Sequence, residues 1–176
     1  MANPEFNIIT RTKQEIVSLA AEGAFIAAAD ESVRPVNPSS VVVWTVPEGD
    51  DMRRTNAGLQ NFPFPAITIS PVRITTQPGR GLNCAEDEAI RVAVQILDNQ
   101  PVSRGRYFAS YGNWISAIRS ALLVTPNPFL QDANVNEYDP FVVHPIERIP
   151  AEARSLLNHN QRVSYFLFQV MVRHHR

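Results

Sequence analysis

The sequence predicts an α+β fold, with a mainly antiparallel sheet packed against two helices in a single domain. Two segments, near residues 12–29 and 106–123, carry apolar residues at helical spacing. Several other segments alternate apolar and polar residues, as half-buried strands do. The order is helix, strands, helix, strands, without the strict strand-helix alternation that builds a parallel doubly wound sheet. A chain of 176 residues has the usual size of one domain with one core.

The first predicted helix runs from about Thr12 to Ala29. Thr12 and Glu15 have the spacing of a capping box, in which both side chains satisfy amide donors at a helix start. An apolar stripe follows at helical spacing: Ile16, Leu19, Ala20, Gly23, Ile26 and Ala27. Its small residues favour close packing against a sheet or another helix.

Two extended segments are expected next. Residues 41–46 are rich in β-branched side chains and end at Pro47, which predicts a strand. Residues 67–74 also favour extended structure, but Pro71 interrupts them. Because proline cannot donate a hydrogen bond to a central ladder, this segment is expected at a sheet edge or at a bulge.

The clearest strand pattern covers residues 89–96. Four branched side chains alternate with Ala89, Arg91, Ala93 and Gln95, which predicts one buried face formed by Ile90, Val92, Val94 and Ile96. The acids Glu86, Asp87 and Glu88 precede this face. We interpret them as a solvated entrance that discourages edge pairing.

The second half of the chain predicts another helix and two strands. The helix runs from about Arg106 to Leu123, with an apolar stripe of Phe108, Tyr111, Ile115, Ile118 and Leu122. A short strand is expected over Phe141–His144, ended by Pro145. The last strand, Arg162–Arg173, is apolar on both faces, so it is expected in the centre of the sheet or against a neighbouring subunit.

Composition excludes several classes of function. A net charge of −1 gives no general attraction to nucleic acid or to an anionic membrane. No stretch reaches the roughly 20 apolar residues of a membrane-spanning helix, and residues 1–7 lack the pattern of a secretory signal. The single cysteine excludes an internal disulfide and a multi-cysteine zinc site, and it fits a reducing compartment.

No motif predicts a catalytic centre, a cofactor or a metal. The glycines near residues 78–81 precede a strand and lack the lysine of a phosphate-binding loop. Cys84 could pair with a histidine as a thiol nucleophile; the candidates are His144, His159, His174 and His175. A small cytosolic enzyme using these residues therefore remains an alternative, and so does a monomeric adaptor domain that binds one protein.

Two surfaces are candidates for contacts between subunits or with neighbouring proteins. The long segment 48–64 contains charged and aromatic residues, namely Asp50, Asp51, Arg53, Arg54, Phe62 and Phe64. Long loops in compact domains are usually functional, and complementary charges fix the register of an interface. The second candidate surface is one face of the last strand, with Tyr165, Leu167 and Met171. A second long loop is expected at about 125–137.

The layout of these elements resembles that of phage tail-terminator and head-to-tail joining proteins, also called tail-completion or neck proteins. The matching parts are the first helix, the extended residues 65–71, the strand 89–96, the helix 111–122 and the aromatic strand 165–170. The resemblance covers most of residues 1–176, which would form a single tail-terminator-like domain.

That resemblance implies a structural protein without catalytic residues. Such proteins form a ring, usually a hexamer, at the head-proximal end of the tail tube, where it ends tail assembly and joins the tail to the neck. The implied partners are further copies of the chain, the tail tube and the neck or connector proteins. DNA would pass through the lumen without specific binding, and no membrane is involved. The expected location is the virion, assembled in the host cytoplasm.

Overall fold

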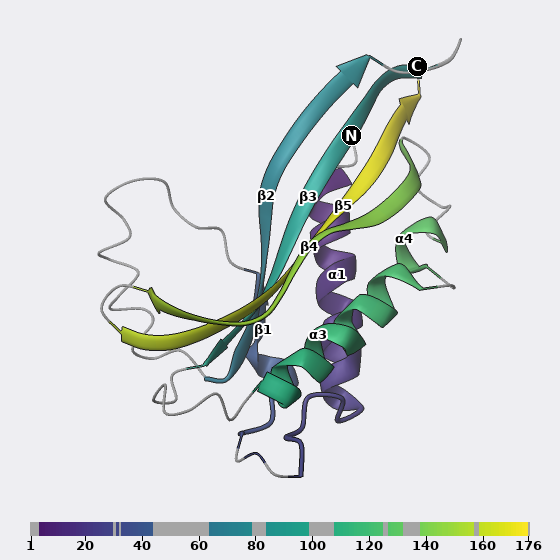
Figure 1. Cartoon of the computed structure of the whole chain (residues 1–176). Helices are drawn as coiled ribbons and strands as arrows, with labels where there is room; N and C mark the ends of the chain where they lie inside the picture. Colours follow the sequence, from purple (N-terminus) through teal and green to yellow (C-terminus); the bar gives the residue numbers. More distant parts are fainter. Residues whose placement is uncertain are drawn as a thin grey trace.

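A five-stranded sheet with helices against one face forms the centre of the molecule (Figure 1). The computed structural model describes residues 4–29, 31, 33–43, 64–78, 84–98, 108–124, 127–131, 138–156 and 159–175. Its elements are α1 (Pro4–Ala21), the 3-10 turn η1 (Pro38–Ser40), β1 (Val41–Val43), β2 (Ala66–Pro78), β3 (Cys84–Asp98), α3 (Phe108–Leu123), α4 (Pro128–Gln131), β4 (Tyr138–Leu156) and β5 (His159–His175). The predicted α+β class is confirmed.

The strand order is β1-β2-β3-β5-β4. Every neighbouring pair is antiparallel except β1 and β2, which run parallel. The predicted mainly antiparallel sheet is therefore confirmed. β5 lies between β3 and β4, which confirms its expected central position. Towards its tip the β4–β5 hairpin bends away from the other strands (Figure 1).

Helix α1 begins at Pro4 and ends at Ala21, so both predicted bounds were wrong. Thr12 lies inside the helix, where its buried Oγ1 donates to the carbonyl oxygen of Ile8 at 2.7 Å and caps no helix end. Glu15 pairs instead with Arg11 at 3.1 Å. The helix stops just before Gly23, whose φ of 76° favours glycine and is typical of a helix C-terminus.

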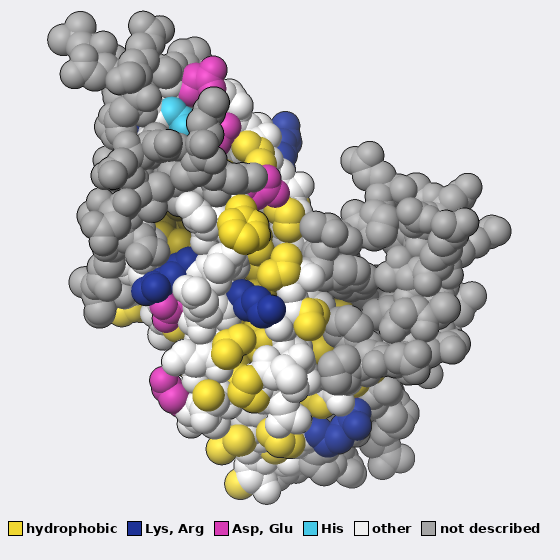
Figure 2. Space-filling model, turned by 180° about the vertical axis from the view of Figure 1, so that it is seen from behind, with side chains coloured by type: hydrophobic (Ala, Val, Ile, Leu, Met, Phe, Trp, Pro, Cys, Tyr) yellow, Lys and Arg dark blue, Asp and Glu magenta, His cyan; other side chains and the backbone are white. Residues whose placement is uncertain are grey.

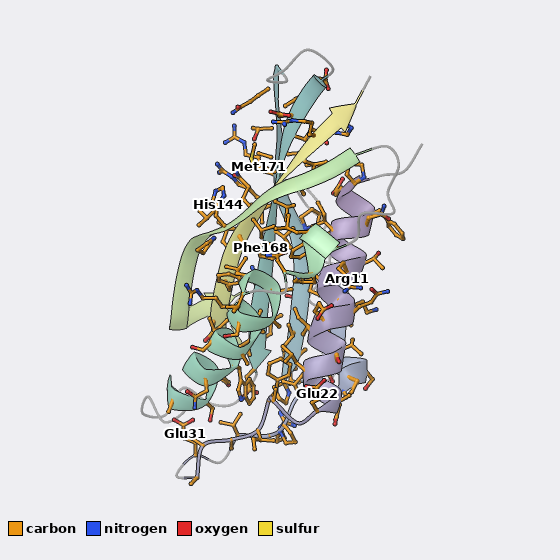
Figure 3. All side chains as sticks on the ribbon, turned by 90° about the vertical axis from the view of Figure 1, so that its right-hand side faces the viewer. Arg11, Glu22, Glu31, His144, Phe168 and Met171 are labelled. Atoms are coloured by element: carbon orange, nitrogen blue, oxygen red, sulfur yellow. The ribbon has the colours of Figure 1, made fainter. Side chains whose placement is uncertain are left out.

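Alternating residues of β3 and β5 build the core beneath the helices. Ile90, Val92, Val94 and Ile96 are completely buried, as their period predicted. On β5 the buried side chains are Phe166, Phe168, Val170 and Val172. The rings of Phe166 and Phe168 stack at 5.7 Å between centroids, and Phe129 of α4 contacts Phe168 at 5.6 Å. Phe168 thus joins the sheet to the helical layer (Figure 3).

The segment after α1 is fastened to α3 by long-range contacts. The indole Nε1 of Trp114 donates to the carbonyl oxygen of Ile26 at 2.7 Å, and its ring meets Phe25 edge to face. The Glu31 carboxylate accepts hydrogen bonds from the backbone amides of Ala109 and Ser110 at 3.1 and 2.9 Å. Glu31 therefore satisfies amide donors at the start of α3, as an N-cap residue would. Ile26, predicted on the buried stripe of a longer helix, is instead exposed.

Strand β4 extends over Tyr138–Leu156, far beyond the predicted Phe141–His144. Three prolines lie within it: Pro140, Pro145 and Pro150. The register against β5 shifts beside each of them, because local bulges accommodate the missing donors. Pro145 is therefore a bulge position inside β4 and not the end of the strand, which is why the prediction was too short.

Candidate interaction surface

The structure describes only part of the two predicted contact surfaces. Asp50, Asp51, Arg53, Arg54 and Phe62 lie outside the described residues. Phe64 is half-buried immediately before β2. Leu167 and Met171 are half-buried on the face of β5 opposite the helices, whereas the side chain of Tyr165 is outside the described part. The prediction that these residues make intersubunit contacts remains a prediction.

Polar contacts cross the outer face of the sheet, which is the face opposite the helices. Gln169 is almost buried there and accepts a hydrogen bond from Nε of Arg91 at 3.0 Å. Its own amide lies 3.0 Å from the sulfur of Met171. In the β3–β5 register, Leu167 lies opposite Ala93 and Met171 lies opposite Ala89, so each large side chain has a small cross-strand neighbour. The described part of this face therefore combines polar and apolar side chains that are neighbours across the strands.

The acidic cluster before the core face is not a solvated entrance. Asp87 is buried and pairs with Arg173 of β5, with Nε to Oδ1 at 3.0 Å. Glu88 lies 3.0 Å from Nε2 of His174. Only Glu86 is exposed. The predicted role was wrong because β3 continues through these acids, so two of them lie beside cationic or titratable partners on the adjacent strand.

Residues 71–78 of β2 follow the part that pairs with β1, and we call this stretch the β2 edge. β1 pairs only with residues 67–69, and no other described residue pairs with this side of β2. Figure 1 shows the upper part of β2 along the border of the sheet, with β3 on one side only. Val72 and Ile74 expose their side chains here. The register shifts at Pro71, so the sequence-based expectation of a bulge is confirmed.

A like-charged pair lies beside the β2 edge. Arg73 and Arg91 are direct cross-strand partners in the antiparallel register. Arg91 donates to Gln169, and within the described residues neither arginine has a carboxylate partner. Like charges directly opposite each other destabilise a strand pair. This part of the outer face is therefore suited to contact a carboxylate from another molecule.

We sort seven exposed large apolar side chains into two groups by the elements that carry them. The first group, on α1, β1 and β2, comprises Phe6, Val43, Val72 and Ile74. The second group, on α3, α4 and β4 and the turn after α3, comprises Val124, Leu130 and Ile146. These seven side chains are 40% to 65% exposed. Figure 2, the view from behind, shows hydrophobic side chains in a broken column down the middle of the molecule. Sequence reasoning missed both groups, because exposure depends on strand order.

Within the described ranges, no three histidine, cysteine or acidic residues gather as they would around a metal ion. The side chain of Cys84 lies outside the described part, so the alternative of a thiol nucleophile is not tested by its surroundings. In the same ranges, helices that combine the length and the apolar character needed to cross a membrane are absent.

Comparison with known proteins identifies no family for this chain. No protein-family model matches the chain, and no curated protein does. Among solved structures, the chain is similar to one described as "Virion of native gene transfer agent (GTA) particle". The sequences are 13% identical, the alignment covers 77% of this chain and 80% of that one, and the TM-score is 0.42. A likeness this distant carries no conclusion about function.

Proposed function

We propose that the chain is a structural subunit of a tailed-phage virion that associates with copies of itself into a ring. The observation that carries this proposal is that strands at both ends of the sheet expose large apolar side chains, namely Val43 on β1, Val72 and Ile74 on β2, and Ile146 on β4. A ring requires head-to-tail contacts, in which two different patches on each copy are complementary. The buried cores of protein interfaces are rich in apolar side chains.

The finer proposal is a hexameric ring at the head-proximal end of the tail tube. There it would end tail assembly and join the tail to neck proteins without acting on a substrate. The support is the order of helices and strands, which resembles that of tail-terminator proteins, together with the α+β fold that this order predicted. The two long segments 48–64 and 125–137 would supply further contacts with the tube and the neck.

Light scattering over a range of protein concentrations tests the ring, with electron microscopy of the protein alone and mixed with purified tail tubes. We expect one closed oligomer, or rings bound at tube ends. Phe6→Glu in the first group and Leu130→Glu in the second should each reduce the ring to monomers. Ile26→Glu is the matched control, because Ile26 is 62% exposed, close to 65% for Phe6, and belongs to neither group.

A protein that stays monomeric at high concentration, even with tail tubes present, would favour the adaptor alternative. If Ile26→Glu disrupted the ring as strongly as the other two variants, the two apolar groups would not be the contact surfaces of the ring. The enzyme alternative predicts turnover that Cys84→Ala abolishes while the fold stays intact. The ring proposal predicts that this variant assembles normally.

A further inference from the structure

Two arginines are direct neighbours on the outer face of the sheet, one on β2 and one on β3. We propose that Arg73 and Arg91 form a binding site for a carboxylate side chain, presented by an acidic and partly apolar segment of another protein. The inference goes beyond the proposed ring and does not depend on it.

The strand register brings the two arginines together. Arg73 is the antiparallel cross-strand partner of Arg91. The Cβ atoms of such partners lie about 4.5–5.5 Å apart, so both guanidinium groups can reach one carboxylate. Arg73 is exposed and Arg91 is half-buried, so part of each side chain is accessible to solvent. The planar guanidinium matches the two oxygens of a carboxylate, which suits arginine to this role.

Gln169 on β5 positions Arg91. Gln169 is only 8% exposed, and its side-chain oxygen accepts a hydrogen bond from Nε of Arg91 at 3.0 Å. Its amide nitrogen lies 3.0 Å from the sulfur of Met171, so the carboxamide is held at both ends. The bond occupies Nε and leaves the terminal nitrogens of Arg91 as donors for a ligand. Because glutamine is neutral, it orients the guanidinium without neutralising its charge.

The charge of the arginine pair is not balanced by the described part of the chain. Within the described residues, neither Arg73 nor Arg91 has a carboxylate partner. Arg173, on the same face, differs in this respect, because it pairs with Asp87 at 3.0 Å. A carboxylate between Arg73 and Arg91 would replace a repulsion across the strands by two charge-assisted contacts. The pair is therefore complementary to a negative group from outside.

Small and apolar side chains surround the arginine pair. Ala89 and Ala93 lie two residues to either side of Arg91, on the same face of β3, so that strand places no large side chain beside the guanidinium. On the neighbouring strand β5, Leu167 and Met171 are half-buried on this face. An apolar residue next to the bound carboxylate would contact them. These surroundings favour a peptide segment that combines acidic and apolar residues.

Nucleic acid fits this site less well. Tight binding of a phosphate backbone requires several cationic contacts along its length. Because Arg173 is paired with Asp87, the described part of the outer face offers a site of two arginines. One carboxylate with two oxygens needs no more donors than these. The net charge of −1 also gives no general attraction to a polyanion.

Fluorescence anisotropy tests the site in the full chain, with a fluorescein-labelled peptide of alternating leucine and glutamate as the probe. We expect binding that weakens about tenfold when glutamine replaces the glutamates of the peptide. Arg73→Gln and Gln169→Glu should each weaken binding about tenfold, the second because it places a carboxylate beside Arg91 within the chain. Arg119→Gln is the matched control, because Arg119 is exposed on α3, in the helical layer. Circular dichroism checks that each variant is folded.

Two results would overturn the proposal directly: no binding at about 1 mM peptide, or an equal loss in Arg119→Gln. A labelled DNA duplex of the same net charge provides the competing occupant. If the duplex bound more tightly than the peptide, and Arg73→Gln removed that binding, the pair would be a nucleic-acid contact and the proposal would be wrong.

Light scattering without peptide separates this proposal from the proposed ring. Arg73→Gln should leave the ring unchanged. If this variant dissolved the ring, the carboxylate would come from a second copy of the chain, contrary to the proposal. Specific peptide binding by a protein that forms no ring would support the arginine site and reject only the proposed function.

Discussion

Glu31 holds together two parts of the chain that are far apart in sequence, so its replacement should have a clear effect on stability. Its two carboxylate oxygens accept from the amides of Ala109 and Ser110, 78 and 79 residues away. Loss of an N-cap side chain costs about 0.5–2 kcal/mol, and a negative charge near a helix N-terminus adds about 0.3–1 kcal/mol. Because Glu31 is half-buried, we expect Glu31→Ala to lower the free energy of unfolding by about 1.5 kcal/mol.

Urea unfolding, followed by circular dichroism, measures this change. With a slope of about 2 kcal/mol per molar urea, the midpoint should fall by about 0.7 M. Glu31→Gln keeps an oxygen acceptor but removes the charge, so it should lose about half as much. The difference in urea midpoint between Glu31→Gln and the parent protein should become smaller in high salt, because salt screens the charge of Glu31.

Glu22 provides the matched control. It is exposed at the end of α1, where its carboxylate accepts a local hydrogen bond from Ser18 at 3.1 Å. Figure 3 shows Glu22 at the end of α1 and Glu31 in the segment that follows. We expect Glu22→Ala to change the midpoint very little. Equal midpoints for Glu31→Ala and Glu22→Ala would refute the capping role of Glu31.

Other substitutions test the pairings within the sheet and the core. Arg73→Glu places a carboxylate opposite Arg91, so the isolated subunit should gain about 0.5–1 kcal/mol in urea unfolding; a loss would contradict the like-charge interpretation. Tyr111→Phe removes a hydroxyl that donates to buried Asp98 at 2.6 Å, and should cost about 1–3 kcal/mol, measured in the same way. Phe168→Ala empties a completely buried site between two other aromatic rings and should cost about 3–5 kcal/mol, seen as a lower thermal midpoint. A shift no larger than that of an exposed control would mean that this core position is not packed as described.

Some parts of the fold could be predicted because their signal is local. The alternation in residues 90–96 places every second side chain on one face, whatever the strand pairs with. The apolar character of both faces of the last strand predicted a central position, and β5 indeed has a neighbour on each side. The stripe of the second helix predicted the burial of Tyr111 and Ile115.

Other local signals were ambiguous. Thr12 is compatible both with a helix start and with a helix interior, where its hydroxyl donates to an earlier carbonyl. Pro145 is compatible with a strand end and with a bulge, and the neighbouring strand decided for the bulge. The acids at the start of β3 could face solvent or a partner. For Asp87, the ion pair with Arg173 on β5 shows that it faces a partner.

The sequence by itself determined the two long helices and the main strands by type, although not their bounds, and which side chains of β3 and β5 are buried. These properties depend on spacing along a few residues. Tertiary structure decided the strand order, the parallel pairing of β1 and the contact of Glu31 with α3. Each of these joins residues far apart in the chain. Their outcome depends on how whole faces pack together, and no local period encodes that.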